Sequence, residues 1–202
     1  CSSDLEDERE IGIGSNNIKA VYVDEQKSLV YIGTHAGGLT VLHRNSGKME
    51  SFNQLNSQLV NENVYAILPD KGGNLLLGTL SALVSFNPEK KSFTTIDKEK
   101  DGTPFTSQRI TILFRDSHKR LWVGGEEGIS VFQQEGIEIE KVPILPESSV
   151  TKTFTNCIYE AANGIIWVGT REGFYCFNEK EKKIKRYTTA NGLPNNVVYG
   201  IL

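Results

Sequence analysis

Four copies of a short apolar pattern that ends in glycine constrain this fold most strongly. The glycines are Gly33, Gly78, Gly124 and Gly169, and they lie 45, 46 and 45 residues apart. Three or four apolar residues precede each glycine, as in Leu-Val-Tyr-Ile-Gly and Leu-Trp-Val-Gly. A fixed period of this length is the mark of a chain that stacks one structural unit several times. We therefore expect a repeat architecture.

The same period extends to the residues around the glycines. An apolar column lies three residues after the start of the next apolar run in each copy and consists of Leu42, Phe86, Phe132 and Phe177. A second column consists of Met49, Phe93, Ile139 and Ile184. Each repeat thus holds four short apolar segments, and alternation such as Ile110-Thr111-Ile112 is the period of a β-strand. Four antiparallel strands in about 45 residues make one blade of a β-propeller, so we expect an all-β propeller. A β-sandwich also has short strands, but it has no reason to repeat its sequence.

The repeats predict where the blades lie. Four four-stranded antiparallel blades are expected at about 16–53, 62–97, 108–143 and 154–188. Residues 196–202 copy the start of the second blade, which predicts the first strand of a fifth. A propeller closes when its last blade meets its first, so residues 1–202 are expected to be a partial propeller, an arc of a larger ring.

Composition excludes several classes of protein. The chain has a net charge of −3 with both signs interspersed, which does not favour nucleic acid as a partner. No apolar run approaches the length that spans a bilayer.

Cys157 and Cys176 fall in the first and third strands of the fourth repeat, about 10 Å apart, which is too far for a disulfide. We interpret both as small buried thiols. Cys1 opens a stretch similar to the mature start of a bacterial lipoprotein, but a cut inside a longer chain is the interpretation we favour.

The combined repeat pattern runs from Asn-x-Val/Ile through a strand and an Asp turn to Leu-Trp-Val-Gly-Thr, then Gly and Phe. It is clearest in residues 110–132 and 157–177. This pattern resembles the two-component regulator propeller repeat of the extracytoplasmic sensors of hybrid two-component systems. Residues 192–198, Gly-Leu-Pro-Asn-Asn-Val-Val, are also typical of that family's connectors. Repeat one departs by having Tyr31 in place of Trp, repeat two by having Leu76, and repeat four by having Ala161 in place of the turn Asp.

This resemblance implies a function and a setting. It implies a seven-bladed ring in the periplasmic part of an inner-membrane receptor, which continues into an immunoglobulin-like domain, a transmembrane helix, a histidine kinase, a receiver and a DNA-binding domain. Such receptors are similar to sensors that detect glycan-derived oligosaccharides and switch on polysaccharide-utilisation genes. The expected partners are an oligosaccharide, the remaining blades and adjoining domains, and a second receptor copy in a homodimer. The resemblance implies no cofactor and no catalytic residue in this piece.

The most variable positions follow each glycine and share one face of the propeller with the connectors between blades. We expect any ligand to bind there, at His35, Glu126, Glu127, Arg171 and Glu172. Other polar residues expected nearby are Asn61, Arg109, Asn195 and Asn196. The alternative is an ordinary solvated rim. By contrast, Trp122 and Trp167 share a column with Tyr31 and Leu76, and a column that accepts leucine is expected to be core.

Catalytic and metal sites are not predicted. His43 and His118 have no ligand partner at metal spacing, and the adjacent Glu126 and Glu127 do not make a glycosidase pair. Residues 116–122 are similar to the Asp-box of sialidase propellers, but the spacing is one residue longer and the glycine is missing. Two alternatives to the sensor remain open: a propeller enzyme acting on polysaccharide, of the lyase or sialidase class, and a protein-docking scaffold.

Overall fold

The computed structural model describes residues 12–105, 109–145 and 149–201. In these residues the chain forms sixteen strands in four antiparallel sheets, and the only helices are two short 3-10 turns, η1 (Ser149–Lys152) and η2 (Thr189–Asn191). The predicted all-β propeller arc of four four-stranded blades is confirmed. Cys1 lies outside the described residues.

Each sheet is a simple meander in which strands adjacent in the chain are adjacent in space. The first contains β1 (Ile18–Asp24), β2 (Leu29–Thr34), β3 (Leu39–His43) and β4 (Met49–Phe52). The second contains β5 (Val64–Pro69), β6 (Leu75–Thr79), β7 (Leu83–Asn87) and β8 (Ser92–Ile96). The third contains β9 (Ile110–Arg115), β10 (Leu121–Gly125), β11 (Gly128–Glu135) and β12 (Glu138–Lys141). The fourth contains β13 (Thr155–Glu160), β14 (Ile166–Thr170), β15 (Phe174–Asn178) and β16 (Lys183–Tyr187).

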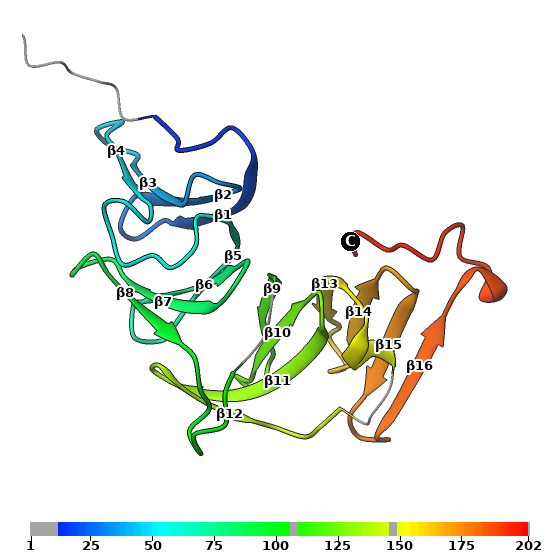
Figure 1. Ribbon diagram of the computed structural model, residues 1–202. Coiled ribbons are helices and arrows are strands. Elements are labelled where there is room, and N and C mark those ends of the chain that lie inside the picture. The colour runs from blue at the N-terminus through cyan, green and yellow to red at the C-terminus, as the bar shows by residue number, and fades with distance from the viewer. Residues whose placement is uncertain (1–11, 106–108, 146–148, 202) are drawn as a thin grey trace, which may run out of the picture.

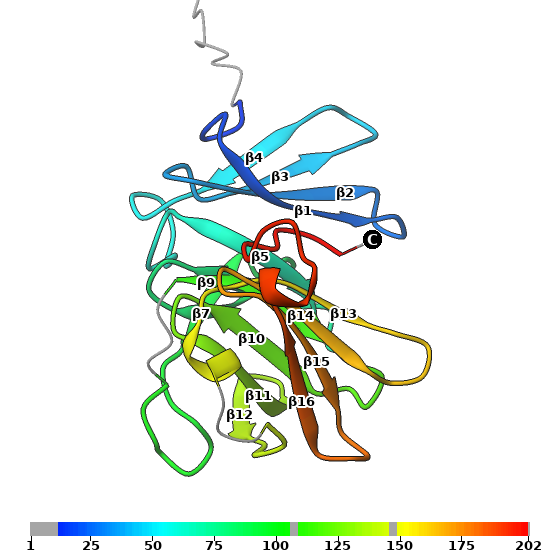
Figure 2. The ribbon, with the colours of Figure 1, turned by 90° about the vertical axis from the view of Figure 1, so that its right-hand side faces the viewer.

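The four sheets stand side by side around an open centre, as Figure 1 shows. The first strands β1, β5, β9 and β13 follow one another along the inner side of the arc and contact their neighbours. The fourth strands β4, β8, β12 and β16 form the outer edges. Figure 2 shows the same arc from the side, with each sheet twisted relative to the next.

The repeated glycine has a steric cause. A Cβ atom added at Gly33 would lie 2.8 Å from the carbonyl oxygen of Val64, in the first strand of the next sheet. At Gly78 the corresponding distance is 2.7 Å, to the carbonyl oxygen of Ile110. Real Cβ atoms do not approach backbone this closely. Only glycine lets the inner strands of neighbouring sheets lie against each other, which explains why the sequence repeats it.

The hydrophobic core is divided into three clusters, and each fills the space between two neighbouring sheets. Tyr31 packs with residues of the second sheet, Leu76 with residues of the third, and Trp122 with residues of the fourth. These three side chains are at most 1% exposed, so this part of the predicted core column is confirmed. One sheet alone has no core, because each of its faces is buried only by a neighbour.

Trp167, the fourth member of that column, corrects the prediction because it is only partly buried. It stacks on Phe174 at 5.0 Å between ring centroids and lies on the opposite face of its sheet from Val168, which packs into the third cluster. Cys157 and Cys176 are free thiols, but both are partly buried rather than buried. Cys176 pairs with Trp167 across the sheet, so it shares the same face. No described sheet covers that face, which explains the exposure of these side chains.

The predicted first strand of a fifth blade is not a strand in this structure. Residues 197–201 do not form a strand, because they make no ladder of hydrogen bonds with a strand in the described part of the chain. The segment still lies where the repeat places it. The Val198 amide donates a hydrogen bond to the Thr170 carbonyl oxygen at 2.9 Å, and the Asn156 side chain donates one to the Val198 carbonyl oxygen at 3.0 Å.

The two ends of the sheets differ, and we name them for what they carry. The connector face carries the loops between second and third strands, at residues 35–38, 80–82, 126–127 and 171–173, with the connectors between sheets. The turn face carries the tight turns, including residues 25–28, 70–74, 116–120 and 161–165.

Charged pairs join neighbouring sheets at the turn face. Arg120 donates to Asp116 in its own sheet at 2.7 Å and to both carboxylate oxygens of Glu179 in the fourth sheet at 2.7 Å. Asp116 is 2% exposed and also accepts a hydrogen bond from the Trp122 indole at 2.8 Å. The stretch that is similar to an Asp-box therefore holds its own turn and the adjoining sheet in place.

Candidate functional site

In three of the four loops of the connector face, a threonine hydroxyl closes the loop with a hydrogen bond. Thr34, Thr79 and Thr170 each follow the repeated glycine and are fully buried. Their hydroxyl groups donate to backbone carbonyl oxygens three or four residues later, at 3.1, 2.8 and 2.9 Å. Because the buried hydroxyl closes the loop, the next residues are presented on the surface. His35 and Arg171 occupy such exposed positions.

A β-bulge recurs near the start of every first strand. The pairing register shifts between Ile18 and Ala20, between Val64 and Ala66, and at the equivalent places in β9 and β13. The extra residues are Lys19, Tyr65, Thr111 and Asn156. A bulge changes the direction of a side chain at the end of a sheet and is common beside functional sites.

The bulge residues reach neighbouring sheets. Thr111 donates a hydrogen bond to the Thr155 carbonyl oxygen at 3.0 Å. The Tyr65 hydroxyl instead lies 3.4 Å from Nδ1 of His35 in the first sheet, and the two rings are stacked 6.3 Å apart. The bulge of the second sheet thus places an aromatic ring on the connector face.

Rings and cations continue from Tyr65 across two further sheets. The Arg109 guanidinium lies over the Tyr65 ring at 5.8 Å and over the Phe154 ring at 5.9 Å. The Arg171 guanidinium lies over the Phe154 ring at 4.0 Å. Distances up to about 6 Å are those of cation–π attraction. We call His35, Tyr65, Arg109, Phe154 and Arg171 the cation–aromatic row, since its members come from all four repeats.

The five residues predicted from the sequence separate into three places. His35 and Arg171 belong to the row, and Glu126 lies beside it, with its carboxylate 3.9 Å from the Arg109 guanidinium. Glu172 faces the outer strand, where its carboxylate lies 3.7 Å from Arg186 and its carbonyl oxygen accepts a hydrogen bond from Arg186 Nε at 2.9 Å. Glu127 lines a separate cavity. The asparagines predicted nearby are used in local turns: the side chains of Asn61, Asn195 and Asn196 accept backbone hydrogen bonds.

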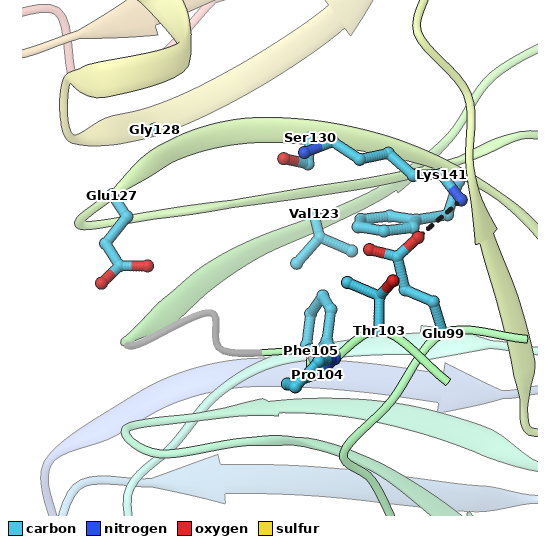
Figure 3. Close-up of a pocket in the computed structure, with 10 residues that line it drawn as sticks. Glu99, Thr103, Pro104, Phe105, Val123, Glu127, Gly128, Ser130 and Lys141 are labelled. Atoms are coloured by element: carbon cyan, nitrogen blue, oxygen red, sulfur yellow. Dashed lines mark hydrogen bonds between the residues drawn. The ribbon is translucent and has the colours of Figure 1, made fainter. Parts of the chain in front are cut away.

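The cavity beside Glu127 has a volume of 340 Å³ and lies between the third sheet and the connector that precedes it (Figure 3). The connector closes on itself through the Glu99 amide, which donates to the Thr103 carbonyl oxygen at 2.7 Å. It is fixed to β12 where Glu99 accepts a hydrogen bond from the Lys141 amide at 3.1 Å. Phe105 packs edge-on against Phe132 at 5.5 Å. Figure 3 shows Phe105 and Val123 in the middle of the cavity wall and Glu127 away from them at one end.

Sequence reasoning missed this cavity and two members of the row. Phe105, Tyr65 and Phe154 were not among the predicted site residues. Phe105 stands alone among polar residues, and Phe154 lies just before a strand at a position that holds Asn63 in the second repeat and Arg109 in the third. A lone aromatic in a polar connector was the available signal, but nothing in the repeat pattern marks it.

In the described residues, no group of three or more His, Cys, Asp or Glu side chains is placed to hold a metal ion. Burial raises the pKa of Cys157 and of Cys176, which keeps both thiols protonated at neutral pH. Within the described part of the chain, no helix is both long and apolar enough to cross a membrane.

Comparison with known proteins identifies the repeat. The family model described as two component regulator propeller matches residues 148–172. The chain is 29% identical over 146 residues to Histidine kinase P4 of Formosa agariphila, which covers 66% of this chain and 11% of the kinase. This chain thus spans about a tenth of that relative. The resemblance to two-component regulator propeller repeats is confirmed.

Solved structures share the fold. The extracellular domain of the hybrid two component system BT4673 from B. thetaiotaomicron matches with a TM-score of 0.72 and 18% identity, over 91% of this chain and 24% of that one. The extracellular domain of the hybrid two component system BT3049 from the same organism matches with a TM-score of 0.68 and 21% identity, over 89% and 24%. At these identities the likeness shows the fold, and the chain again spans about a quarter of each structure.

Proposed function

We propose that this chain, which carries two-component regulator propeller sequence, is part of the non-catalytic sensor region of a hybrid two-component receptor. The region lies in the periplasm, outside an inner membrane, and responds to a glycan-derived oligosaccharide. Its output is the regulation of polysaccharide-utilisation genes. The similarity to a histidine kinase and to the extracellular domains of hybrid two-component systems supports this role.

The observation that carries the proposal is the contrast between repeated core and varied loops. The residues between sheets are apolar and committed to packing. The residues after each glycine differ from copy to copy, and the row combines partly buried aromatic rings with planar hydrogen-bond donors on one face. Aromatic faces with a few convergent polar groups are the usual means of fixing a ring-shaped polar ligand.

The row also suggests how binding is transmitted. Its five residues come from four repeats, so a ligand that contacts several of them links blades that otherwise touch only their neighbours. In the receptor we expect the remaining blades, the adjoining domains and a second receptor copy to respond to that change. Such a response requires the ligand to bind one arrangement of the blades more tightly than another.

The test is calorimetric titration of the complete extracytoplasmic region that contains this chain. The titrants are a panel of neutral and acidic oligosaccharides, and the variants are Arg171→Ala and Glu126→Ala. We expect at least one sugar to bind and the two substitutions to change its affinity. If both variants bind that sugar as tightly as the unmodified protein, this face is not the site. Chromatography of the incubated sugars should show no cleavage, because cleavage would favour a propeller enzyme.

A further inference from the structure

Two arginines of the connector face differ from the other arginines in the described residues. Four arginines donate side-chain hydrogen bonds to protein acceptors: Arg44, Arg115, Arg120 and Arg186. Neither Arg109 nor Arg171 donates a side-chain hydrogen bond to a described residue. Both lie against the same ring, that of Phe154. Within the described part of the chain, the N–H groups of these two neighbouring guanidinium groups are therefore without hydrogen-bond acceptors.

Aromatic rings hold these two guanidinium groups in place of carboxylates. Arg171 is exposed and lies over Phe154, and Arg109 lies near both Phe154 and Tyr65. Stacking on a ring leaves the five N–H donors of a guanidinium free to bind something else. It also restricts the side chain before a ligand arrives, which lowers the entropy lost on binding.

The nearby carboxylates satisfy these arginines poorly. Glu126 lies 3.9 Å from Arg109, beyond hydrogen-bond distance, and the two side chains are 58% and 40% exposed. A pair of this kind contributes little. Glu172 is paired with Arg186, and Arg171 has no carboxylate within ion-pair distance among the described residues. An incoming anion would therefore displace no strong ion pair.

We propose that the cation–aromatic row recognises an acidic oligosaccharide, whose carboxylate or sulfate groups bind at Arg109 and Arg171. The exposed ring of His35 and the partly buried ring of Tyr65 stacked beside it provide the surface for an adjoining sugar ring. This inference rests on the proposed carbohydrate-sensing function and specifies its ligand class. Guanidinium groups match carboxylate and sulfate oxygens in a planar, two-point geometry, which a hydroxyl group of a neutral sugar does not offer.

A substitution at Glu126 should change the affinity in a direction that depends on the charge of the ligand. Its carboxylate stands beside Arg109 and repels an acidic ligand while it competes for the same donors. Replacing it with glutamine removes the charge and keeps the size of the side chain. Glu126→Gln should therefore tighten the binding of an acidic sugar, whereas a neutral sugar that uses this carboxylate as an acceptor would bind more weakly.

The experiment compares matched charged and uncharged sugars on the complete extracytoplasmic region. Trigalacturonate is titrated beside its methyl ester, and a κ-carrageenan tetrasaccharide beside its desulfated form, so that carboxylate and sulfate are separated. We expect one acidic form to bind at least about tenfold more tightly than its neutral partner, with an affinity that falls as salt is added. Arg109→Gln and Arg171→Gln should each remove most of that preference, and Arg44→Gln, an exposed arginine of the turn face, should leave it unchanged.

The outcomes separate this inference from the proposed function. Binding of neutral sugars as tightly as acidic ones, with no effect of Arg109→Gln and Arg171→Gln, overturns the acidic ligand and leaves carbohydrate sensing intact. A weaker acidic complex in Glu126→Gln also overturns the inference. If none of the four probes nor the wider panel binds, carbohydrate sensing fails and the inference fails with it. Thermal melts of each variant confirm that the region is folded.

Discussion

At the turn face, Arg120 donates hydrogen bonds from all three of its guanidinium nitrogens, whereas the guanidinium of Arg171 at the connector face donates none to a described residue. The same side chain thus has opposite surroundings at the two ends of the sheets. Arg120 is 11% exposed and joins two sheets through Asp116 and Glu179. Arg171 is exposed and lies on a ring.

This difference indicates that charges at the turn face contribute to stability, whereas charges at the connector face are available for binding. At the turn face, removal of a partner leaves a buried or half-buried charge without its hydrogen bonds, which is costly. At the connector face, water replaces whatever a substitution removes. Substitutions at the turn face should therefore change stability, and those at the connector face should change binding.

The largest effect is expected for Trp122→Ala. The indole is fully buried between the third and fourth sheets and donates to the buried Asp116. Removal of a large aromatic from a core costs about 3–5 kcal/mol of unfolding free energy. Urea melts of the complete extracytoplasmic region measure this loss, with Ile137→Ala, at an exposed hairpin tip, as the control. A loss below about 1 kcal/mol would show that the turn face does not depend on this core residue.

A smaller loss is expected for Arg120→Gln. The substitution leaves Glu179 without both of its hydrogen bonds and Asp116 without one of its partners. We expect a loss of about 2–3 kcal/mol, below that of a fully buried pair because the Glu179 side chain is 38% exposed. Arg44→Gln, at an exposed ion pair of the same face, is the matched control and should change stability little. Equal effects of the two variants would contradict a special role for the Arg120 network.

The fold could be predicted from the sequence because its physical causes repeat. Every copy needs a glycine where the next inner strand passes, as Gly33 and Gly78 show, and an apolar residue where two sheets meet. Trp167 was predicted as core from that repetition and is only partly buried. A sequence column reports the environment of an average blade, while the burial of one side chain depends on the sheet actually beside it.

The candidate site was less predictable because its members do not repeat. His35 and Arg171 could be found as variable residues at equivalent loop positions. Their connection could not, since it depends on the bulge that redirects Tyr65 and on Phe154, which lies outside the loops. Glu172 was predicted with them but is engaged by Arg186 from the outer strand. Position along the loop alone does not determine which neighbour a side chain meets.

The pH dependence of stability provides a further test of the Arg120–Glu179 pair at the turn face. Hydrogen bonds from Arg120 hold the pKa of Glu179 below its ordinary value of 4.5 in the folded protein. The unfolded chain therefore binds this proton more readily, so the stabilisation is present above pH 4.5 and is lost as the pH falls through the lower folded value. In Glu179→Gln that part of the acid dependence should disappear. Parallel slopes of stability against pH below 4.5 in the two proteins would contradict the pairing.

The smallest effect on stability is expected for Arg171→Gln, although its effect on binding should be large. The only described partner of the Arg171 guanidinium is the Phe154 ring, and a cation–π contact at an exposed site contributes about 0.5–1 kcal/mol. The free energy of unfolding of this variant should therefore stay within about 1 kcal/mol of that of the unmodified protein. It should be well above the free energy of unfolding of Arg120→Gln, measured in the same way. If Arg171→Gln destabilises the protein as much as Arg120→Gln does, the row holds the sheets together as the turn-face pairs do. The connector face would then be structural at these positions, and recognition would have to come from other residues such as those that line the cavity at Phe105.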